Sequence, residues 1–179
     1  MKFTALALVC LAILIPASAN ADKWQAQWKK VDDAVQQGLP KTAIEQLQPI
    51  LVAATAEKNY PVAIKAIGRK IALEGVIQGN KPEEKITRLE AEIAKAPADM
   101  RPMLEVVQAE WYWQYFLHNR WRFMQRTATS APPGKDFTTW DLPRLFAEID
   151  KHFRTALAAA DQLKKIPIGD YNDLLEKGR

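Results

Sequence analysis

Few side chains in this sequence have the types and spacing that catalysis requires. The only two histidines, His118 and His152, are far apart, and neither forms a metal-ligand pair at helical spacing. The adjacent carboxylates Asp32-Asp33 and Glu83-Glu84 point in different directions on a helix, so neither pair forms an acid and base couple. We expect His118 to hydrogen-bond a neighbour on its helix and His152 to be exposed. The sequence therefore predicts a protein that is not an enzyme, without a catalytic, cofactor-binding or metal site.

Aromatic side chains between Trp111 and Arg126 are the strongest candidates for recognition. Seven of the thirteen residues from Trp111 to Phe123 are aromatic. A helix that is apolar over so much of its circumference is usually buried, which is the interpretation we favour. The alternative is a platform for a glycan or peptide. At helical spacing three faces arise: Leu104, Val107, Trp111, Tyr115 and His118; Tyr112, Phe116 and Phe123; and Trp113, Leu117, Trp121 and Met124.

Three arginines, Arg120, Arg122 and Arg126, lie among and just after the last aromatic residues and have two possible roles. They could form the polar rim of a platform, or pair with Asp136, Asp141 or Glu148 and clamp the proline-rich loop 127–138 onto the helix. We favour the clamp, with Trp140 folded back over the basic end of the helix. The candidate interaction or structural cluster comprises Trp111, Tyr115, Arg120, Trp121, Arg122, Arg126, Trp140 and Asp141.

Apolar residues at three- and four-residue spacing predict helices along the whole chain after residue 21. Pro49 should kink or break the second helix, and Asp99 should cap the fifth. The sixth helix, capped by Asp141 or Thr139, is predicted to bury Leu145, Phe146, Ile149, Phe153, Leu157 and Leu163. Residues 127–137 should form an exposed loop. The expected helices are 22–37, 41–57, 63–76, 82–96, 100–125, 141–163 and a short one at 171–177.

The fold class that follows is all-α. Glycine and proline fall between the helical patterns and no strand alternation is sustained, which indicates six to seven helices in antiparallel hairpins, as a bundle or a short α-solenoid. Gly38 before Ala43 and Pro61 before Ala63 are loosely spaced as in tetratricopeptide-like repeats, without the full signature. We expect one helical domain at 22–179, with hairpins at 22–97 and the aromatic helix, loop and last helices at 98–179.

The first residues are typical of an export signal. Lys2 precedes an apolar run at 3–15, and small residues allow cleavage after Ala19 or Ala21, so residues 1–21 are predicted to be removed. The run is shorter than the roughly twenty residues that span a bilayer, so we expect no stable membrane span after cleavage. The only cysteine, Cys10, would leave with the signal. The sequence predicts a periplasmic or extracellular protein.

Charge gives little support for nucleic acid as a partner. The formal net charge is +4, and positive and negative residues alternate along the chain instead of forming a basic block. Export makes such a partner less plausible still, so we expect the partners to be proteins.

Several stretches together resemble one known family. In order, these are Trp28-Lys29-Lys30-Val31-Asp32, Gly38-Leu39-Pro40-Lys41-Thr42-Ala43, Lys58-Asn59-Tyr60, Ile64-Lys65-Ala66, the run at 119–127 and Asp136-Phe137-Thr138-Thr139-Trp140-Asp141. Their order and spacing are similar to those of the N-terminal helical region of large bacterial alpha-2-macroglobulin family proteins. The similarity covers nearly all of 22–179.

The resemblance implies a packing or interaction module in a protease-inhibitor or envelope-defence context. Family members carry this region ahead of β-sandwich macroglobulin domains, and some have a Cys-Gly-Glu-Gln thioester that captures proteases. This sequence contains neither, so no residue here inherits that chemistry, and we interpret the chain as a truncated or split gene product. The implied partners are downstream macroglobulin domains or a protease. The alternative is a free-standing helical-repeat module that binds a peptide or glycan through its aromatic helix.

Overall fold

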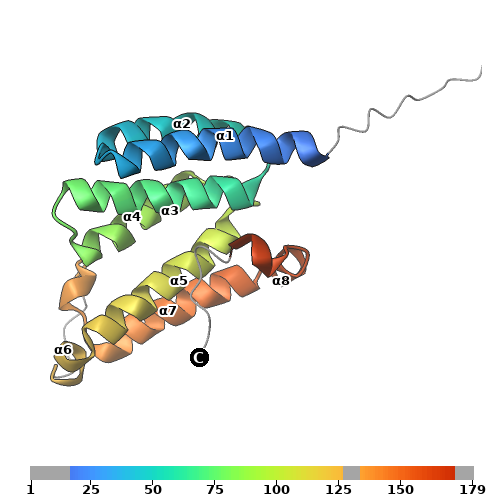
Figure 1. Ribbon diagram of the computed structural model, residues 1–179. Helices are drawn as coiled ribbons and strands as arrows, with labels where there is room; N and C mark the ends of the chain where they lie inside the picture. Colours follow the sequence, from blue (N-terminus) through green and yellow to red (C-terminus); the bar gives the residue numbers. More distant parts are fainter. Residues whose placement is uncertain (1–16, 127–133, 172–179) are drawn as a thin grey trace, which may run out of the picture.

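The chain is all-α wherever the structure describes it. The structure, a computed structural model, describes residues 17–126 and 134–171, and within these ranges helices pack as sequential antiparallel pairs without a strand (Figure 1). This confirms the predicted fold class. The α-helices are α1 (Ala17–Gln36), α2 (Pro40–Ala56), α3 (Tyr60–Ile77), α4 (Pro82–Lys95), α5 (Arg101–His118), α6 (Arg120–Met124), α7 (Leu142–Leu157) and α8 (Ala160–Leu163), and the 3₁₀ helices are η1 (Phe137–Thr139) and η2 (Ile168–Tyr171).

Proline and glycine set most of the helix boundaries. A proline occupies the first or second position of five helices, where its missing N–H would have no helical partner anyway. Gly38 and Gly79, after α1 and α3, have φ of +70° and +88°, a left-handed conformation that a side chain disfavours. These turns reverse the chain, so consecutive helices are antiparallel.

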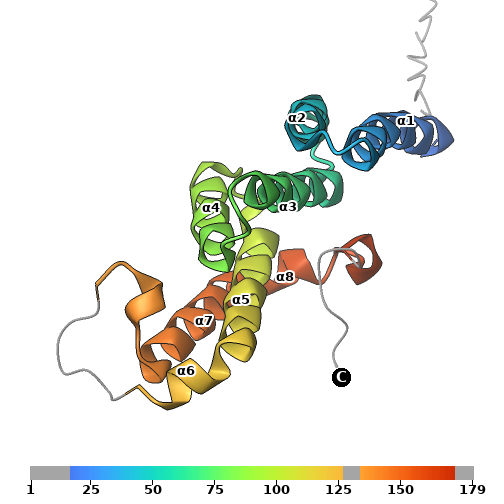
Figure 2. The same ribbon diagram turned by 60° about the vertical axis from the view of Figure 1, so that its left-hand side comes forward.

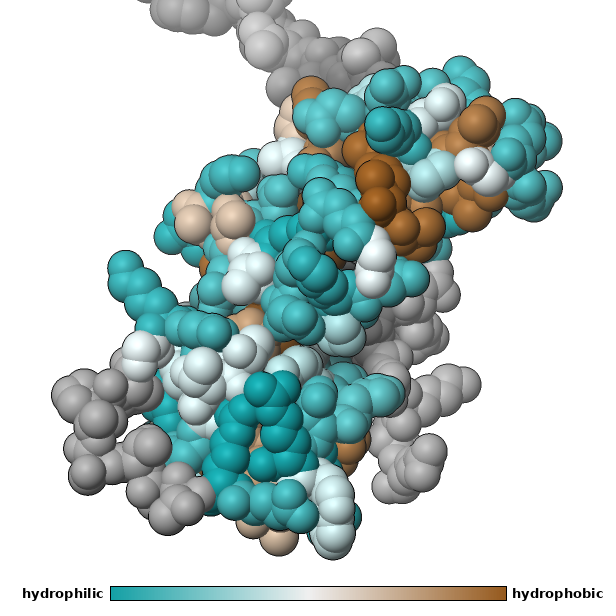
Figure 3. Space-filling model, turned by 90° about the vertical axis from the view of Figure 1, so that its left-hand side faces the viewer, coloured by the Kyte–Doolittle hydropathy of each residue, from teal (hydrophilic) through white to brown (hydrophobic). Residues whose placement is uncertain are grey.

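Two cores share the helix α5. The upper core lies among α1–α4 and the first turns of α5, and the lower core among the later turns of α5 and α6, η1 and α7. In Figure 2 the α5–α7 pair extends away from the layer formed by α1, α2 and α3, with α4 between them. Figure 3 shows apolar surface mainly over the upper helices, whereas the lower end is mostly hydrophilic or pale.

Three local predictions about helices need correction. The helix α2 is not broken at Pro49, which is exposed, so the carbonyl group that loses its partner can face water. The aromatic helix is not continuous to 125, because α5 ends at His118 and the Asn119 side chain donates to the Tyr115 carbonyl at 2.9 Å. Asp99 does not cap α5. The N-cap is Met100, within a turn closed by the Pro97 carbonyl.

The later part of the chain agrees with prediction only in part. Asp141 caps α7 as predicted, since its carboxylate accepts from the Arg144 N–H at 3.0 Å. That helix ends at Leu157 instead of reaching 163, and α8 is a separate turn. The predicted helix at 171–177 lies outside the described residues apart from Tyr171, which ends η2.

The predicted signal segment also falls mostly outside the described residues. The described residues start at Ala17 in α1, and the two candidate cleavage sites, after Ala19 and Ala21, lie within that helix. Among the described residues, no helix is both long and apolar enough to cross a membrane.

Candidate functional site

One half of the aromatic stretch is buried in the lower core. Tyr112, Tyr115, Phe116 and Phe123 are each at most 7% exposed. Phe137, from η1, packs edge-on against Tyr112 and Tyr115, with ring centroids 5.3 and 5.1 Å apart. Edge-to-face aromatic pairs add to the free energy gained from burial. These four residues are therefore buried, as the favoured interpretation predicted.

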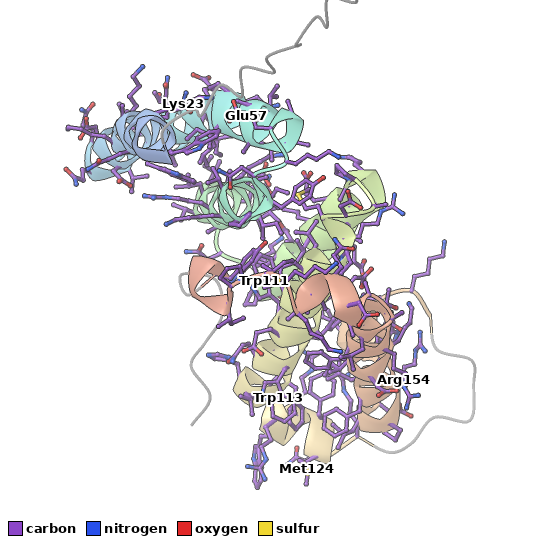
Figure 4. The ribbon with its side chains drawn as sticks, turned by 90° about the vertical axis from the view of Figure 1, so that its right-hand side faces the viewer. Lys23, Glu57, Trp111, Trp113, Met124 and Arg154 are labelled. Atoms are coloured by element: carbon purple, nitrogen blue, oxygen red, sulfur yellow. The ribbon has the colours of Figure 1, made fainter. Side chains whose placement is uncertain are left out.

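The other half of the stretch faces solvent. Trp113, Leu117, Trp121 and Met124 are 39, 45, 77 and 57% exposed, and they are the residues that helical spacing placed on one face. Figure 4 shows Trp113 and Met124 toward the lower end of the molecule, with Trp111 nearer the upper helices. The stretch is therefore a core on one side and an exposed aromatic surface on the other.

Trp111 lies where the two cores meet. Its half-buried ring packs against residues of both, and the Lys85 ammonium group is 4.7 Å from the ring centroid. This site is a junction within the fold, so Trp111 contributes to structure more than to the exposed surface.

Arg126 clamps the segment after the loop, but its partners differ from those predicted. Its guanidinium donates to the carbonyl oxygens of Thr138 and Trp140 at 2.6 and 2.5 Å, and it lies 5.0 Å from the Phe123 ring centroid. Arg122 makes a longer contact of 3.5 Å with the same Thr138 oxygen. These backbone oxygens lie at the end of the short helix η1, which leaves them without helical partners.

The carboxylates proposed as arginine partners are engaged elsewhere. Asp136 accepts from the Thr138 N–H and hydroxyl at 3.0 and 2.7 Å. These hydrogen bonds lower the pKa of Asp136, and the charges of Arg122 and Arg126 lower it to a smaller extent. Glu148 pairs with Arg144 and Lys151 on its own helix. The prediction of a clamp holds for Arg126, whereas the predicted ion pairs with Asp136 and Glu148 are wrong.

Trp140 folds back as expected and closes the lower core. It is 6% exposed, stacks on Tyr112 at a centroid distance of 6.4 Å, and donates from its indole to the Gly134 carbonyl at 2.7 Å. The Arg144 guanidinium covers the ring at 4.6 Å. Residues 127–133 of the predicted loop lie outside the described residues. Phe137, placed in an exposed loop by the sequence, is buried because its ring completes the aromatic cluster.

Sequence reasoning missed a buried polar cluster around His152. The predicted exposure of this histidine is wrong: it is 7% exposed, its Nδ1 contacts Glu105, and its Nε2 is 3.6 Å from Glu148. Its ring stacks on Tyr112, whose hydroxyl donates to Glu90 at 2.9 Å. Burial, with the nearby charge of Glu90, raises the pKa of Tyr112. The sequence did contain a signal for the burial of His152, since this residue lies at helical spacing from Leu145, Ile149 and Ala156, which are also buried.

The contacts of this cluster hold neighbouring helices together. Gln108, fully buried, donates to the Ile86 carbonyl at 3.2 Å and so ties α5 to α4. Among the described residues, no group of three or more histidine, cysteine, aspartate or glutamate side chains is arranged to hold a metal ion. The cluster links α4, α5 and α7 through contacts of buried side chains.

Surface hollows occur beside Trp121. Two open depressions of about 460 and 480 Å³ are both lined by Trp121 and His118. His118 is exposed and contacts the Gln114 carbonyl at 2.8 Å, the neighbour contact predicted for it. Arg120, Arg122 and Met124 line one hollow or the other. Both hollows are shallow, so they suit a contact surface better than an enclosed small molecule.

The helix α7 buries a different face from the one predicted. Leu145 and Ile149 are buried, but Phe146, Phe153 and Leu157 are 39, 39 and 64% exposed. The buried face instead includes Glu148, His152 and Ala156, because the polar cluster takes the inward positions. Leu163, on α8, is partly buried against the upper core.

The exposed residues of α5, α6 and α7 form one surface. Phe146 links the helices, since its ring is 6.2 Å from Trp113 and 5.0 Å from Phe116. We call this surface the open apolar face and define it by Trp113, Leu117, Trp121, Met124, Phe146, Phe153 and Leu157.

Comparison with known proteins adds no relative. No protein-family model, curated protein or solved structure matches this chain.

Proposed function

We propose that this chain is an exported, non-enzymatic helical module that packs against another protein through the open apolar face. The observation that carries the proposal is the exposure of seven large apolar side chains on α5, α6 and α7. Soluble monomers rarely expose apolar patches of this extent, and such patches commonly mark interaction sites. Trp121, at 77% exposure, is the most accessible anchor.

The resemblance to alpha-2-macroglobulin family proteins supports the same proposal. Two of the stretches that carry it, 119–127 and 136–141, are separated in the sequence but meet in the fold through the contacts of Arg126 with Thr138 and Trp140. Residues that act together in a structure are expected to recur together. On this basis the partner is a macroglobulin domain array or a protease, and the setting is the periplasm or the exterior.

A binding experiment tests the proposal. The chain, purified from an exporting host, is titrated by calorimetry with the macroglobulin domains of a bacterial alpha-2-macroglobulin family protein whose own helical region has been deleted. We expect binding, weakened at least tenfold by Phe146→Ser. The matched control is Val52→Ser, a similarly truncated apolar residue that is 59% exposed on α2. Absence of binding, or hydrolysis of peptides or glycosides by the homogeneous chain, would contradict the proposal.

A second candidate is a module that binds a peptide or glycan at the exposed aromatic residues. The observation in its favour is Trp121, which lies between Arg120 and Arg122 and lines both surface hollows. Stacking on an indole with charged neighbours is a common way to hold such ligands. Iodide should quench Trp113 and Trp121, and a bound peptide or oligosaccharide should protect them. Lack of iodide quenching in the free protein excludes this candidate.

A further inference from the structure

We infer that the protein bound at the open apolar face places a carboxylate group in the hollow beside Trp121 that Arg122 and Arg126 line. The inference rests on the proposed function, because it assigns a chemistry to the partner proposed there. That partner is apolar where it covers the face and acidic where it reaches α6. Figures 1 and 2 show α6 at the lower end of the α5–α7 pair.

The hollow combines cationic, amide and aromatic side chains. Its volume is about 460 Å³, and it is formed by α6 and the turns at the two ends of that helix. The Trp121 indole, 77% exposed, also belongs to the open apolar face. Among the described residues, no aspartate or glutamate lines the hollow. The lining residues are His118, Asn119, Trp121, Arg122, Gln125 and Arg126.

The guanidinium groups around α6 lack the carboxylate partners that other arginines have. Within the described ranges, Arg120, Arg122 and Arg126 form no ion pair. Arg122 and Arg126 instead contact backbone carbonyl oxygens, which carry no net charge and so leave the positive charges in place. By contrast, four other arginines pair with carboxylates: Arg69 with Asp32, Arg88 with Glu84, Arg144 with Glu148 and Arg154 with Asp150.

The carboxylates close to these arginines do not neutralise them. Burial raises the pKa of Tyr115; Arg122 and Arg126 oppose this shift, while Glu83 and Asp136 add to it, so these four charged groups lie near one ring. Neither carboxylate lines the hollow. Three guanidinium groups against these two carboxylates leave a positive excess at the lower end of the molecule.

A carboxylate suits this hollow better than a neutral group. A guanidinium group presents its donors as a fork that a carboxylate accepts with both oxygens, and such charge-assisted hydrogen bonds are roughly twice as strong as neutral ones. A partner that buries the Trp121 indole brings its neighbouring side chains to Arg122, because both residues line the same hollow. Tryptophan and arginine are also enriched among the residues that dominate the binding energy of protein interfaces.

Charge reversal is the first test, on the full chain from an exporting host and the macroglobulin domains that test the proposed function. We expect Arg122→Glu to raise Kd about tenfold or more. Arg154→Glu is the matched control. It makes the same change of charge at an exposed arginine of α7 that already pairs with Asp150, and should change Kd by less than about twofold. Equal effects of the two reversals, or none from Arg122→Glu, overturn the inference.

The salt dependence of binding separates the acidic contact from the apolar one. The association rate of the wild type should fall as NaCl rises from about 50 to 500 mM, and Arg122→Gln should weaken this dependence. Phe146→Ser removes an apolar contact, so it should speed dissociation and leave the salt dependence unchanged. Association of the wild type that does not respond to salt contradicts a carboxylate at Arg122.

A probe used without the domains separates this inference from the proposed function. Hexaglutamate is added to the isotope-labelled full chain, and NMR follows the Trp121 indole N–H. We expect a saturable shift that Arg122→Gln removes and Arg154→Gln keeps, and its absence overturns the inference. An equal shift with inorganic phosphate, or with vesicles of phosphatidylglycerol and phosphatidylcholine, also overturns it, because the hollow would then bind phosphate groups.

The two experiments together give distinct outcomes. A hexaglutamate shift that depends on Arg122, without binding of the macroglobulin domains, would overturn the proposed partner and support an acidic protein group in the hollow. Binding of the domains that Phe146→Ser weakens and Arg122→Glu does not would overturn the inference and leave the proposed function standing.

Discussion

The upper and lower cores are packed with different kinds of side chain. The upper core contains alanines among larger, mainly aliphatic side chains, and Ala43, Ala54, Ala63 and Ala66 are all at most 1% exposed. The lower core is built from aromatic rings around Tyr112, and part of its cover is the irregular segment 134–141 instead of a helix. Alanine permits close approach of helix backbones, whereas rings fill a wider gap.

The difference predicts sensitivity to different changes. Where alanines let two helices approach closely there is no room for a larger side chain, so these positions of the upper core should not tolerate enlargement. A core of rings loses much volume when one ring is removed. The lower core depends in addition on hydrogen bonds that hold its irregular cover in place.

Removing a ring from the lower core should have the largest effect. Phe123→Ala deletes a side chain that is 1% exposed and packs against Tyr115 and Phe116. We expect the free energy of unfolding to fall by about 3–5 kcal/mol, measured by urea denaturation. Trp121→Ala, on the exposed side of the same helix, should change it by less than about 0.5 kcal/mol. Equal losses of unfolding free energy in the two variants would contradict the assignment of Phe123 to the core and of Trp121 to the exposed surface.

Enlarging a residue in the upper core should come next. Ala63→Leu inserts methylene groups at a fully buried position of α3, which packs closely against α2. The expected loss is about 1–3 kcal/mol in the free energy of unfolding, from overpacking. Ala26→Leu, at an exposed position of α1, is the control and should be nearly neutral. A neutral Ala63→Leu would show that the upper core has unfilled space.

Releasing the cover of the lower core should have a smaller effect. Arg126→Met keeps an apolar stem but removes the hydrogen bonds to the Thr138 and Trp140 carbonyls. We expect a loss of about 1 kcal/mol, since the site is only partly buried. Arg120→Met removes an exposed guanidinium without these bonds and should change nothing measurable. Hydrogen exchange should show faster opening of 136–140 in the Arg126 variant alone.

Low pH should slightly destabilise the segment 134–141 that covers the lower core. The pKa of Asp136 is held below its ordinary 3.8 by hydrogen bonds from Thr138, so its contribution to stability is complete above that value. As pH falls through the lowered pKa, the carboxylate protonates and the contribution is lost. Thermal unfolding of the wild type and Asp136→Asn should therefore differ by a constant amount above about pH 5 and converge below pH 3.8. A difference that persists at low pH would contradict this account.

Helix positions could be predicted because their signals are local. Prolines at the starts of helices and the glycines that follow α1 and α3 act through their own backbone geometry, whatever the rest of the chain does. Asp141 was recognisable as a cap for the same reason. The break at Asn119 was not, because the aromatic pattern continues across it and hides the local hydrogen bond from the Asn119 side chain to the Tyr115 carbonyl.

The exposed side of the candidate site was harder to predict because helical spacing groups residues without saying which group faces inward. Trp113, Leu117, Trp121 and Met124 were grouped correctly, but burial depends on where α7 and η1 lie. On α7, Phe146 and Phe153 resembled core residues, whereas His152 and Glu148 take the inward positions. A buried polar cluster supplied by three helices leaves only a partial signature in each, here the spacing of His152 with Leu145, Ile149 and Ala156 on α7.

The helix α5 belongs to both cores, with Leu104 and Val107 in the upper one and Tyr112 and Phe116 in the lower. Trp111 lies at the boundary and contacts each side. Neither core can melt while the other keeps a complete α5, so the two should unfold cooperatively, in a single transition. The two cores, although packed with different side chains, thus unfold together. Shortening the side chain of Trp111 is the change that should most readily separate their unfolding into two steps.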